Sequence, residues 1–191
     1  MKDGGMAKLC LFLVLSELVG GIVMWYVVQV RTGAEERIRN QCINTIDGRT
    51  LERCFVPYYE EKKRYQGIWH TERKVLFPGY VFMVSSQLDD LYRSLRKVIG
   101  MTKLLGTGNE IVPLREDEVQ LLKKMRADEK VLEISTGIMD QGSVVITEGP
   151  LAGMEGSIRK IDRHKRKAWL EIQMFGRTME MEAGLEVIER K

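Results

Sequence analysis

Cysteine and histidine are scarce in this sequence, which has three cysteines and two histidines among its 191 residues. Cys10, Cys42 and Cys54 are an odd number without a Cys-x-x-Cys pair, which argues against a disulfide framework or a zinc ribbon and is typical of a reduced, cytoplasmic protein. His70 and His164 alone do not favour a histidine-based metal site. We therefore expect neither a metal nor a cofactor.

Enzyme motifs are also lacking. The sequence shows no pairing of a nucleophile with a base, no phosphate loop of the Walker type and no metal-ligand spacing. The net charge of +3 is too small to indicate a partner, so the local distribution of charge is more informative. At 44% hydrophobic and 30% charged residues, the chain can build a core. We expect a protein that is not an enzyme.

The chain has no convincing membrane span. The apolar segment 9–23 is interrupted by Ser16 and Glu17 and is shorter than the roughly 20 residues that a spanning helix needs, so we expect no membrane partner. We interpret 1–23 as a non-native or mis-assigned extension with the translation start at Met24, because the glycine codons of residues 20 and 21 would be purine-rich where a ribosome-binding site would lie. The mass of the endogenous protein tests this.

The residues after Met24 predict an α+β domain. The aromatic and β-branched run 25–30 predicts a strand. The apolar run 77–84 predicts a central strand covered on both faces, with Pro78 at its first position. The order of the predicted elements is typical of an antiparallel sheet flanked by helices. These elements are strands at 25–30, 53–59, 77–84 and 101–105, helices at 34–46, 88–95 and 116–125, and a charged hairpin loop at 60–69.

The pattern changes after residue 125. Residues 126–141 lose apolar periodicity and predict a linker, so 24–125 and 142–191 are expected to be separate domains. From 142 onward short strands alternate with glycines at 149, 153, 156, 176 and 184. This pattern predicts a small β-barrel, with strands at 143–147, 156–162, 167–174 and 178–182 and a final turn near 186–188.

Two sets of motifs carry a family resemblance. Trp-Tyr-Val-Val at 25–28 is followed by Phe-Pro-Gly-Tyr-Val at 77–81, and Glu-Gly-Pro-Leu-Ala-Gly-Met-Glu-Gly at 148–156 is followed by Phe-Gly-Arg at 175–177. Together they resemble the NusG family of transcription elongation factors. The first pair is similar to its N-terminal domain and the second to its KOW domain. A KOW domain alone also occurs in ribosomal proteins, so a ribosome-associated RNA-binding protein is an alternative.

The resemblance implies a non-enzymatic, monomeric elongation factor. The N-terminal domain of the family docks on the clamp helices of RNA polymerase through an apolar cavity and suppresses pausing. Gln29, Phe77 and Tyr80 match the positions lining that cavity, although Phe77 and Tyr80 could equally be core residues. Tyr92, Arg93 and Ser94 match the part of the family's helix that touches the opposite polymerase lobe.

A basic cluster indicates a specialised member of the family. Six cations and one Asp162 lie in 159–167, a local net charge of six minus one, or +5. General members are acidic there, so the chain resembles the specialised antiterminators, and LoaP more than RfaH, because Gln41 and Asn44 replace the DNA-reading residues of RfaH. We predict a hairpin turn of unpaired cations that binds a nascent RNA leader; a solvated turn is the alternative. Its residues are Arg159, Lys160, Arg163, His164, Lys165, Arg166 and Lys167, extended by Lys62, Lys63 and Arg64.

A second partner surface is implied by the family's loop at 174–177. In the general factor this loop binds a small ribosomal subunit protein or Rho. The matching residues are Phe175, with Ile172 and Arg177 beside it, and the alternative is that Phe175 closes the barrel core. A general NusG-type factor that couples to Rho or the ribosome is thus the alternative to a leader-recruited antiterminator.

Overall fold

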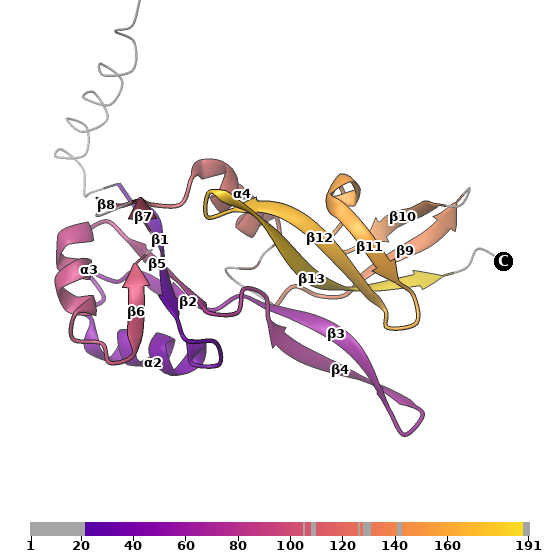
Figure 1. Ribbon diagram of the computed structural model, residues 1–191, viewed down its shortest axis with the longest axis horizontal. Coiled ribbons are helices and arrows are strands. Elements are labelled where there is room, and N and C mark those ends of the chain that lie inside the picture. Colours follow the sequence, from indigo (N-terminus) through magenta and orange to yellow (C-terminus); the bar gives the residue numbers. More distant parts are fainter. Residues whose placement is uncertain are drawn as a thin grey trace, which may run out of the picture. The chain divides into compact units, whose positions relative to one another are not determined.

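The chain folds into two compact units. The structure is a computed structural model that describes residues 22–104, 106, 107, 110–125, 127, 131–140 and 143–188, and within 101–111 it gives the backbone alone. One unit combines the chain up to residue 54 with 81–113, and the other combines 55–80 with 114–191. Figure 1 shows the elements of both. The hypothesis of a translation start at Met24 concerns residues 1–23, of which 1–21 lie outside the described residues.

The first unit is built on a four-stranded sheet with the order β2-β5-β1-β6. Its strands are β1 (Met24–Val30), β2 (Arg53–Phe55), β5 (Tyr80–Ser85) and β6 (Met101–Leu104), and β7 (Gly106–Thr107) pairs with β8 (Glu110–Ile111) beside it. β1 and β6 are antiparallel. Every residue of β5 is buried, and Val81, Phe82 and Met83 have no exposed surface. The predicted central strand, covered on both faces, is confirmed.

A tight turn precedes β5. The Tyr80 amide donates to the Phe77 carbonyl oxygen at 3.2 Å, and Gly79 has a φ of 86°. Proline in the second position and glycine in a left-handed third position are what a type II turn favours. Pro78 is therefore a turn residue. The prediction that it opens the strand is wrong, because the strand begins at Tyr80.

Helices α2 (Glu35–Thr45) and α3 (Leu88–Leu95) complete the first unit. Their apolar spacing places Ile38, Cys42, Leu91 and Leu95 in the core, all fully buried. Each helix carries two acidic residues in its first turn, where carboxylates interact favourably with the helix dipole. The two helices predicted from this spacing are confirmed.

The second unit contains a long antiparallel hairpin of β3 (Tyr58–Tyr65) and β4 (Ile68–Val75). Its two-residue turn has φ values of 49° at Gln66 and 84° at Gly67. Two left-handed residues characterise a type I′ turn, whose twist matches that of the strands it joins.

The predicted loop over 60–69 is wrong for most of its length, because its charges are paired across the two strands. Glu60 of β3 pairs with Arg73 directly opposite it on β4 at an N–O distance of 3.9 Å. Glu61 and Lys63 pair diagonally across the ladder with Lys74 at 2.6 Å and Glu72 at 3.6 Å. Opposite charges directly across an antiparallel ladder stabilise it. Such strands show no apolar alternation, so the sequence pattern resembled a loop.

Five strands form the C-terminal sheet of this unit, in the order β10-β9-β13-β12-β11. They are β9 (Ser135–Asp140), β10 (Ser143–Glu148), β11 (Ile158–Asp162), β12 (Lys167–Met174) and β13 (Arg177–Ile188). Neighbours are antiparallel except β13 and β9, which are parallel. In this order β10 and β11 are the end strands, so the pairings describe an open sheet, and closure into a small barrel stays a prediction.

Two expectations for the C-terminal part are corrected. Strand β9 occupies 135–140, within the range predicted as an irregular linker. A single long strand replaces the separate strand and turn predicted for 178–188. Both differences arise from the pairing of β13 with β12 along its first part and with β9 along its last part. The helical turn η1 (Glu155–Ser157) lies between β10 and β11.

The helix α4 (Glu116–Lys124) belongs to the second unit and buries Val119 and Leu122, as its spacing predicted. The backbone of β3 also belongs here, because the Glu60 amide donates to the Leu132 carbonyl oxygen at 2.9 Å and the Leu132 amide donates to the Tyr58 carbonyl oxygen at 2.8 Å. This grouping differs from the predicted domains 24–125 and 142–191, and separability at a linker remains a prediction about the chain in solution. Among the described helices none combines the length and apolar character needed to cross a membrane.

Candidate nucleic-acid interface

The predicted basic turn lies between β11 and β12. The Lys165 amide donates to Asp162 Oδ1 at 2.9 Å, and this hydrogen bond lowers the pKa of Asp162. Arg166 has a φ of 53°, which completes the reversal of the chain. The turn is thereby fixed with Arg163, His164 and Lys165 exposed to solvent.

Two arginines near this turn are ion-paired on the sheet. Arg159 holds Glu171 through Nη2 to Oε1 at 3.1 Å and Nε to Oε2 at 3.3 Å. Arg166 Nη1 lies 2.7 Å from Glu186 Oε1. Pairs this exposed contribute little to stability, but they offset part of the positive charge of the cluster.

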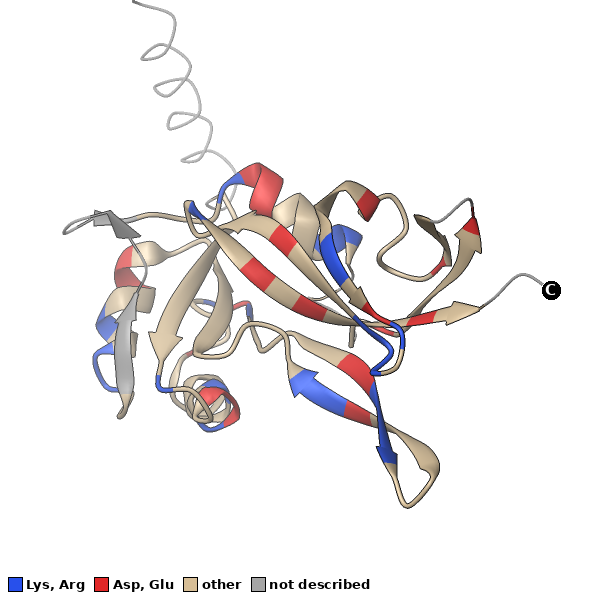
Figure 2. Cartoon of the chain, turned by 45° about the vertical axis from the view of Figure 1, so that its right-hand side comes forward, with Lys and Arg blue, Asp and Glu red and all other residues tan. Residues whose placement is uncertain are grey.

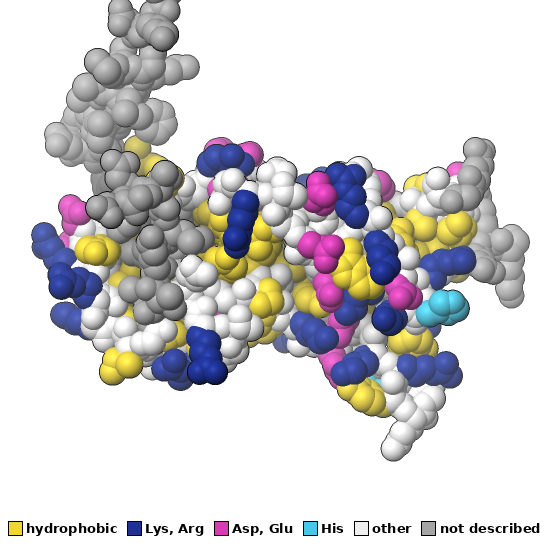
Figure 3. Space-filling model, in the orientation of Figure 1, with side chains coloured by type: hydrophobic (Ala, Val, Ile, Leu, Met, Phe, Trp, Pro, Cys, Tyr) yellow, Lys and Arg dark blue, Asp and Glu magenta, His cyan; other side chains and the backbone are white. Residues whose placement is uncertain are grey.

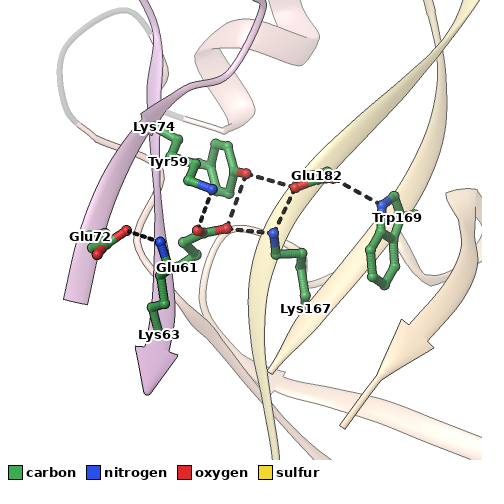
Figure 4. Close-up of polar contacts among 8 residues, drawn as sticks. All are labelled: Tyr59, Glu61, Lys63, Glu72, Lys74, Lys167, Trp169 and Glu182. Atoms are coloured by element: carbon green, nitrogen blue, oxygen red, sulfur yellow. Dashed lines mark hydrogen bonds and ion pairs between the residues drawn. The ribbon is translucent and has the colours of Figure 1, made fainter. Parts of the chain in front are cut away.

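Lys167 is the most enclosed cation of the cluster. Its Nζ lies 2.6 Å from Glu61 Oε2 on β3 and 2.8 Å from Glu182 Oε2 on β13. Tyr59 donates to the same Glu182 oxygen at 2.9 Å, and Trp169 Nε1 donates to its other oxygen at 3.2 Å. Figure 4 shows this network joining β3 to the C-terminal strands.

The pKa values in the network follow from the balance of burial and pairing. Burial alone would raise the pKa of Glu61 and of Glu182, but hydrogen bonds from Lys167, together with those from Lys74 and Tyr59, lower both pKa values below their ordinary range. Burial would lower the pKa of Lys167, yet its two carboxylate partners raise it. Burial first, and then the hydrogen bond to Glu182, raises the pKa of Tyr59.

The expectation of six unpaired cations is therefore wrong, because Arg159, Arg166 and Lys167 pair with carboxylates and Arg163 also has an interaction partner. The carboxylates lie on β3, β12 and β13. Glu171 of β12 follows the cluster closely in sequence, whereas Glu61 of β3 is distant in sequence and near only in the fold. Lys160 Nζ lies 4.9 Å from the centroid of the Trp169 ring. The exposed cations of the cluster are thus Arg163 and Lys165 at the turn and Arg159 and Lys160 on β11.

The β3–β4 hairpin lies close to this turn. Arg166 Cζ is 4.1 Å from the centroid of the Trp69 ring, and Arg64 Cζ is 5.9 Å from it. Arginine stacks well on indole. Lys62, Lys63 and Arg64, predicted to extend the basic surface, therefore lie on an element that contacts the basic turn.

Charge of both signs is distributed over these two elements. Figure 2 shows Lys and Arg on the β3–β4 hairpin and around the turn between β11 and β12, with Asp and Glu between them on the strands. Figure 3 shows basic side chains alternating with acidic ones on the surface of this unit. A polyanion would meet a surface on which cations and anions alternate along the strands, with further cations at the β11–β12 turn.

Aromatic residues predicted for two different partners contact each other. The Phe175 ring stacks on Tyr80 with centroids 4.7 Å apart and packs edge-on against Phe77 at 6.0 Å. Arg177 Nη2 donates to the Tyr80 hydroxyl. Phe175 is half-buried, and it stands with a φ of 58° in the turn between β12 and β13. Ile172 is 4% exposed and lies in the core, so it offers no surface to a partner in this structure.

The other predicted polymerase contacts belong to the first unit. Gln29 is an exposed residue of β1. Tyr92 of α3 is 47% exposed, Arg93 is also exposed and pairs with Asp90 within the helix at 3.4 Å, and Ser94 is half-buried. Three of these residues are thus surface residues on two elements of one unit.

Sequence reasoning missed Glu61, Glu182 and Trp69 as interface residues. The two glutamates lie in charged strands and resemble solvated residues; only their packing reveals that Glu61 is 3% exposed. One signal was Gly184, placed in a strand where glycine is unfavourable unless a backbone approaches closely. A Cβ there would overlap the Glu60 carbonyl oxygen.

Comparisons with known proteins agree on one family. A family model described as "Transcription termination factor nusG" matches residues 24–123. The chain is 29% identical over 174 residues to "Transcription termination/antitermination protein NusG" of Bacillus subtilis (strain 168), covering 87% of this chain and 97% of that protein.

A protein with the same description from Staphylococcus aureus (strain Mu50) is 29% identical over 184 residues, covering 92% of this chain and 100% of that protein. The solved structure described as "Domain interaction in Thermotoga maritima NusG" has a TM-score of 0.57 and 21% identity, covering 85% of this chain and 94% of that one. This structure supports a similar fold.

Proposed function

Because the chain belongs to the NusG family, whose model matches residues 24–123, we propose that it is a transcription elongation and antitermination factor that binds RNA polymerase and is recruited through a leader in the nascent RNA. Its relatives are named termination/antitermination proteins. The observation that carries RNA recruitment is the fixed turn that exposes Arg163, His164 and Lys165. Cations on a rigid hairpin turn suit recognition of RNA by phosphate and shape.

The cations of the cluster have unequal parts in this proposal. Arg163 and Lys165 are exposed at the turn. Arg159 is held by Glu171 in a bidentate pair and Lys167 is enclosed by two carboxylates. A phosphate would have to displace those carboxylates, so we assign the main RNA contact to the turn. We therefore propose that the chain resembles the specialised antiterminator LoaP rather than a general factor.

Polymerase docking is proposed through Phe77 and Tyr80, with Gln29, Tyr92, Arg93 and Ser94 as surface contacts. Phe77 is 1% and Tyr80 7% exposed here, and the Phe175 ring packs against both. A polymerase helix and Phe175 would compete for the same aromatic surface.

A general factor that binds Rho or a small ribosomal subunit protein is the second candidate. Phe175 and Arg177 support it, because a left-handed turn presents both at one end of the β12–β13 hairpin. The two candidates differ in their requirement for a leader: a recruited antiterminator acts only on templates that encode it, whereas a general factor acts on all.

The testing experiment measures RNA affinity against salt and then transcription through a terminator. Each cation that contacts a phosphate contributes roughly 0.7–0.9 to the slope of log affinity against log salt. The double variant Arg163→Ala/Lys165→Ala should therefore flatten the slope by about 1.4–1.8 and abolish antitermination while polymerase binding persists. Arg159→Ala removes a paired charge of the same hairpin and is the matched control. It should change the salt slope less. An unaltered slope in the double variant would reduce the turn to a solvated surface.

A further inference from the structure

We propose that the tip of the β3–β4 hairpin is a stacking site for an unpaired base of single-stranded RNA, with the Tyr65 ring as its platform. This inference rests on the proposed function, because it concerns the unpaired part of the RNA whose phosphates the β11–β12 turn would contact. Tyr65 is 46% exposed and is the last residue of β3 before the turn. A large ring is thus displayed where the fold does not need it for its core.

Four side chains share one face of this tip. Lys63 and Tyr65 alternate along β3, and their partners on β4 are His70 and Ile68, so all four point to the same side of the ladder. The Tyr65 and His70 ring centroids are 6.1 Å apart with planes inclined by 56°. Lys63 Nζ lies 4.9 Å from the Tyr65 centroid, and Ile68 is 63% exposed.

This grouping matches the chemistry of a nucleotide. A base has a π-face that stacks on an aromatic ring, and its phosphate pairs with a nearby cation. A cation–π contact at an exposed site is weak, and the Lys63 ammonium is 3.6 Å from Glu72 in a partly exposed pair, so Lys63 can turn to a phosphate at little cost. The type I′ turn keeps the platform rigid, which reduces the ordering required on binding.

The charge around the tip favours a polyanion over an apolar peptide. Arg64 donates to the Gly67 carbonyl at 3.1 Å and lies near Trp69. Arg166 approaches the same indole from the basic turn. Trp69 directly follows Ile68 in β4 and therefore points to the opposite face of the ladder from Tyr65. The basic turn thus approaches the hairpin from the other face, and a strand leaving a structured RNA would pass around the hairpin tip to contact both.

Two RNAs test the proposal: a stable stem-loop with a blunt end, and the same stem-loop with a short oligoadenylate tail. The full-length protein should bind the tailed RNA more tightly. Tyr65→Ala should remove that difference, a loss of about 5- to 150-fold for a single stacked base, while affinity for the blunt stem-loop and the salt slope are unchanged. Tyr65→Phe should retain the tail-dependent gain, because the ring remains.

Ile68→Ala is the matched control, since it removes an exposed side chain opposite Tyr65 without removing a ring, and it should change neither RNA. If Ile68→Ala and Tyr65→Ala lost the tail-dependent gain in affinity equally, and Tyr65→Leu retained it, the tip would be an apolar surface for a protein. That result would overturn the proposal. A tail that adds nothing to wild-type affinity also overturns it, yet leaves the proposed function standing if the stem-loop binds. Failure of both RNAs to bind the wild type would instead contradict RNA recruitment.

Discussion

Removing the Glu61 carboxylate should weaken the second unit far more than removing a surface carboxylate of the same hairpin. The Glu61 carboxylate forms ion pairs with Lys74 Nζ and Lys167 Nζ, each at an N–O distance of 2.6 Å, and its side chain is 4% exposed. Breaking a buried pair costs about 3–5 kcal/mol when a charge is left uncompensated. Lys167 retains Glu182 at 2.8 Å and Lys74 is 45% exposed, so we expect Glu61→Gln to cost roughly 2–3 kcal/mol, near a hydrogen bond between charged groups.

Urea denaturation followed by tryptophan fluorescence and circular dichroism measures this cost. The midpoint should fall with an unchanged slope, because the change affects stability and not the surface exposed on unfolding. Glu72→Gln is the control: Glu72 also faces a lysine across the hairpin, at 3.6 Å, but is 33% exposed. It should cost under about 1 kcal/mol. Equal costs for the two variants would refute the reasoning that burial makes the Glu61 site strong.

The same site has a defined pH dependence. The folded pKa values of Glu61 and Glu182 are lowered, so their contribution is present above the unfolded value of about 4.5 and is lost as pH falls through the folded values. The pKa of Lys167 is raised, so its contribution is present below about 10.5 and is lost as pH rises through the folded value. The stability difference between wild type and Glu61→Gln should therefore be largest at neutral pH and shrink below about pH 4.5. A difference that grows on acidification would contradict the lowered pKa.

Two further changes test close contacts. Gly184→Ala should destabilise the unit by about 1–3 kcal/mol in thermal unfolding, because its Cβ would lie 2.8 Å from Ile134 Cγ1 as well as against the β3 backbone; Gly156→Ala, with open space around it, is the control and should be near neutral. Phe175→Ala should raise polymerase affinity about 2- to 12-fold, the equivalent of an aromatic pair worth 0.5–1.5 kcal/mol, when binding is measured with purified polymerase. Weaker binding would show instead that Phe175 itself contacts the polymerase.

Elements with a clear apolar pattern could be predicted from the sequence. The run that became β5 is apolar on both faces, and the helices repeat their apolar residues at the spacing that buries one side, as Ile38 and Leu91 show. The β3–β4 hairpin could not be predicted in this way. Its stabilising contacts are charge pairs across strands and a turn of Gln66 and Gly67, neither of which produces an apolar alternation.

The position of the candidate interface could be predicted from the sequence, but the pairing of its charges could not. The reversal of the chain near Arg163 follows from polar residues between two apolar strands, and the structure has it. The pairing of Lys167 with Glu61 depends on two segments that are distant in sequence. Local composition gives the number of charges in a segment, whereas only the tertiary fold determines which of them face carboxylates.

The parallel pairing of β13 with β9 has a consequence for the order of folding. β11, β12 and β13 form an antiparallel meander, and β9 and β10 form a hairpin, so these contacts close short loops and can form on a microsecond scale. Leu185, by contrast, pairs with Ser135, and closing that large loop costs more chain entropy before any ladder bond offsets it. We expect the meander and the hairpin to form early and the β13–β9 ladder to close in the rate-limiting step, so that substitutions along this ladder would chiefly slow folding.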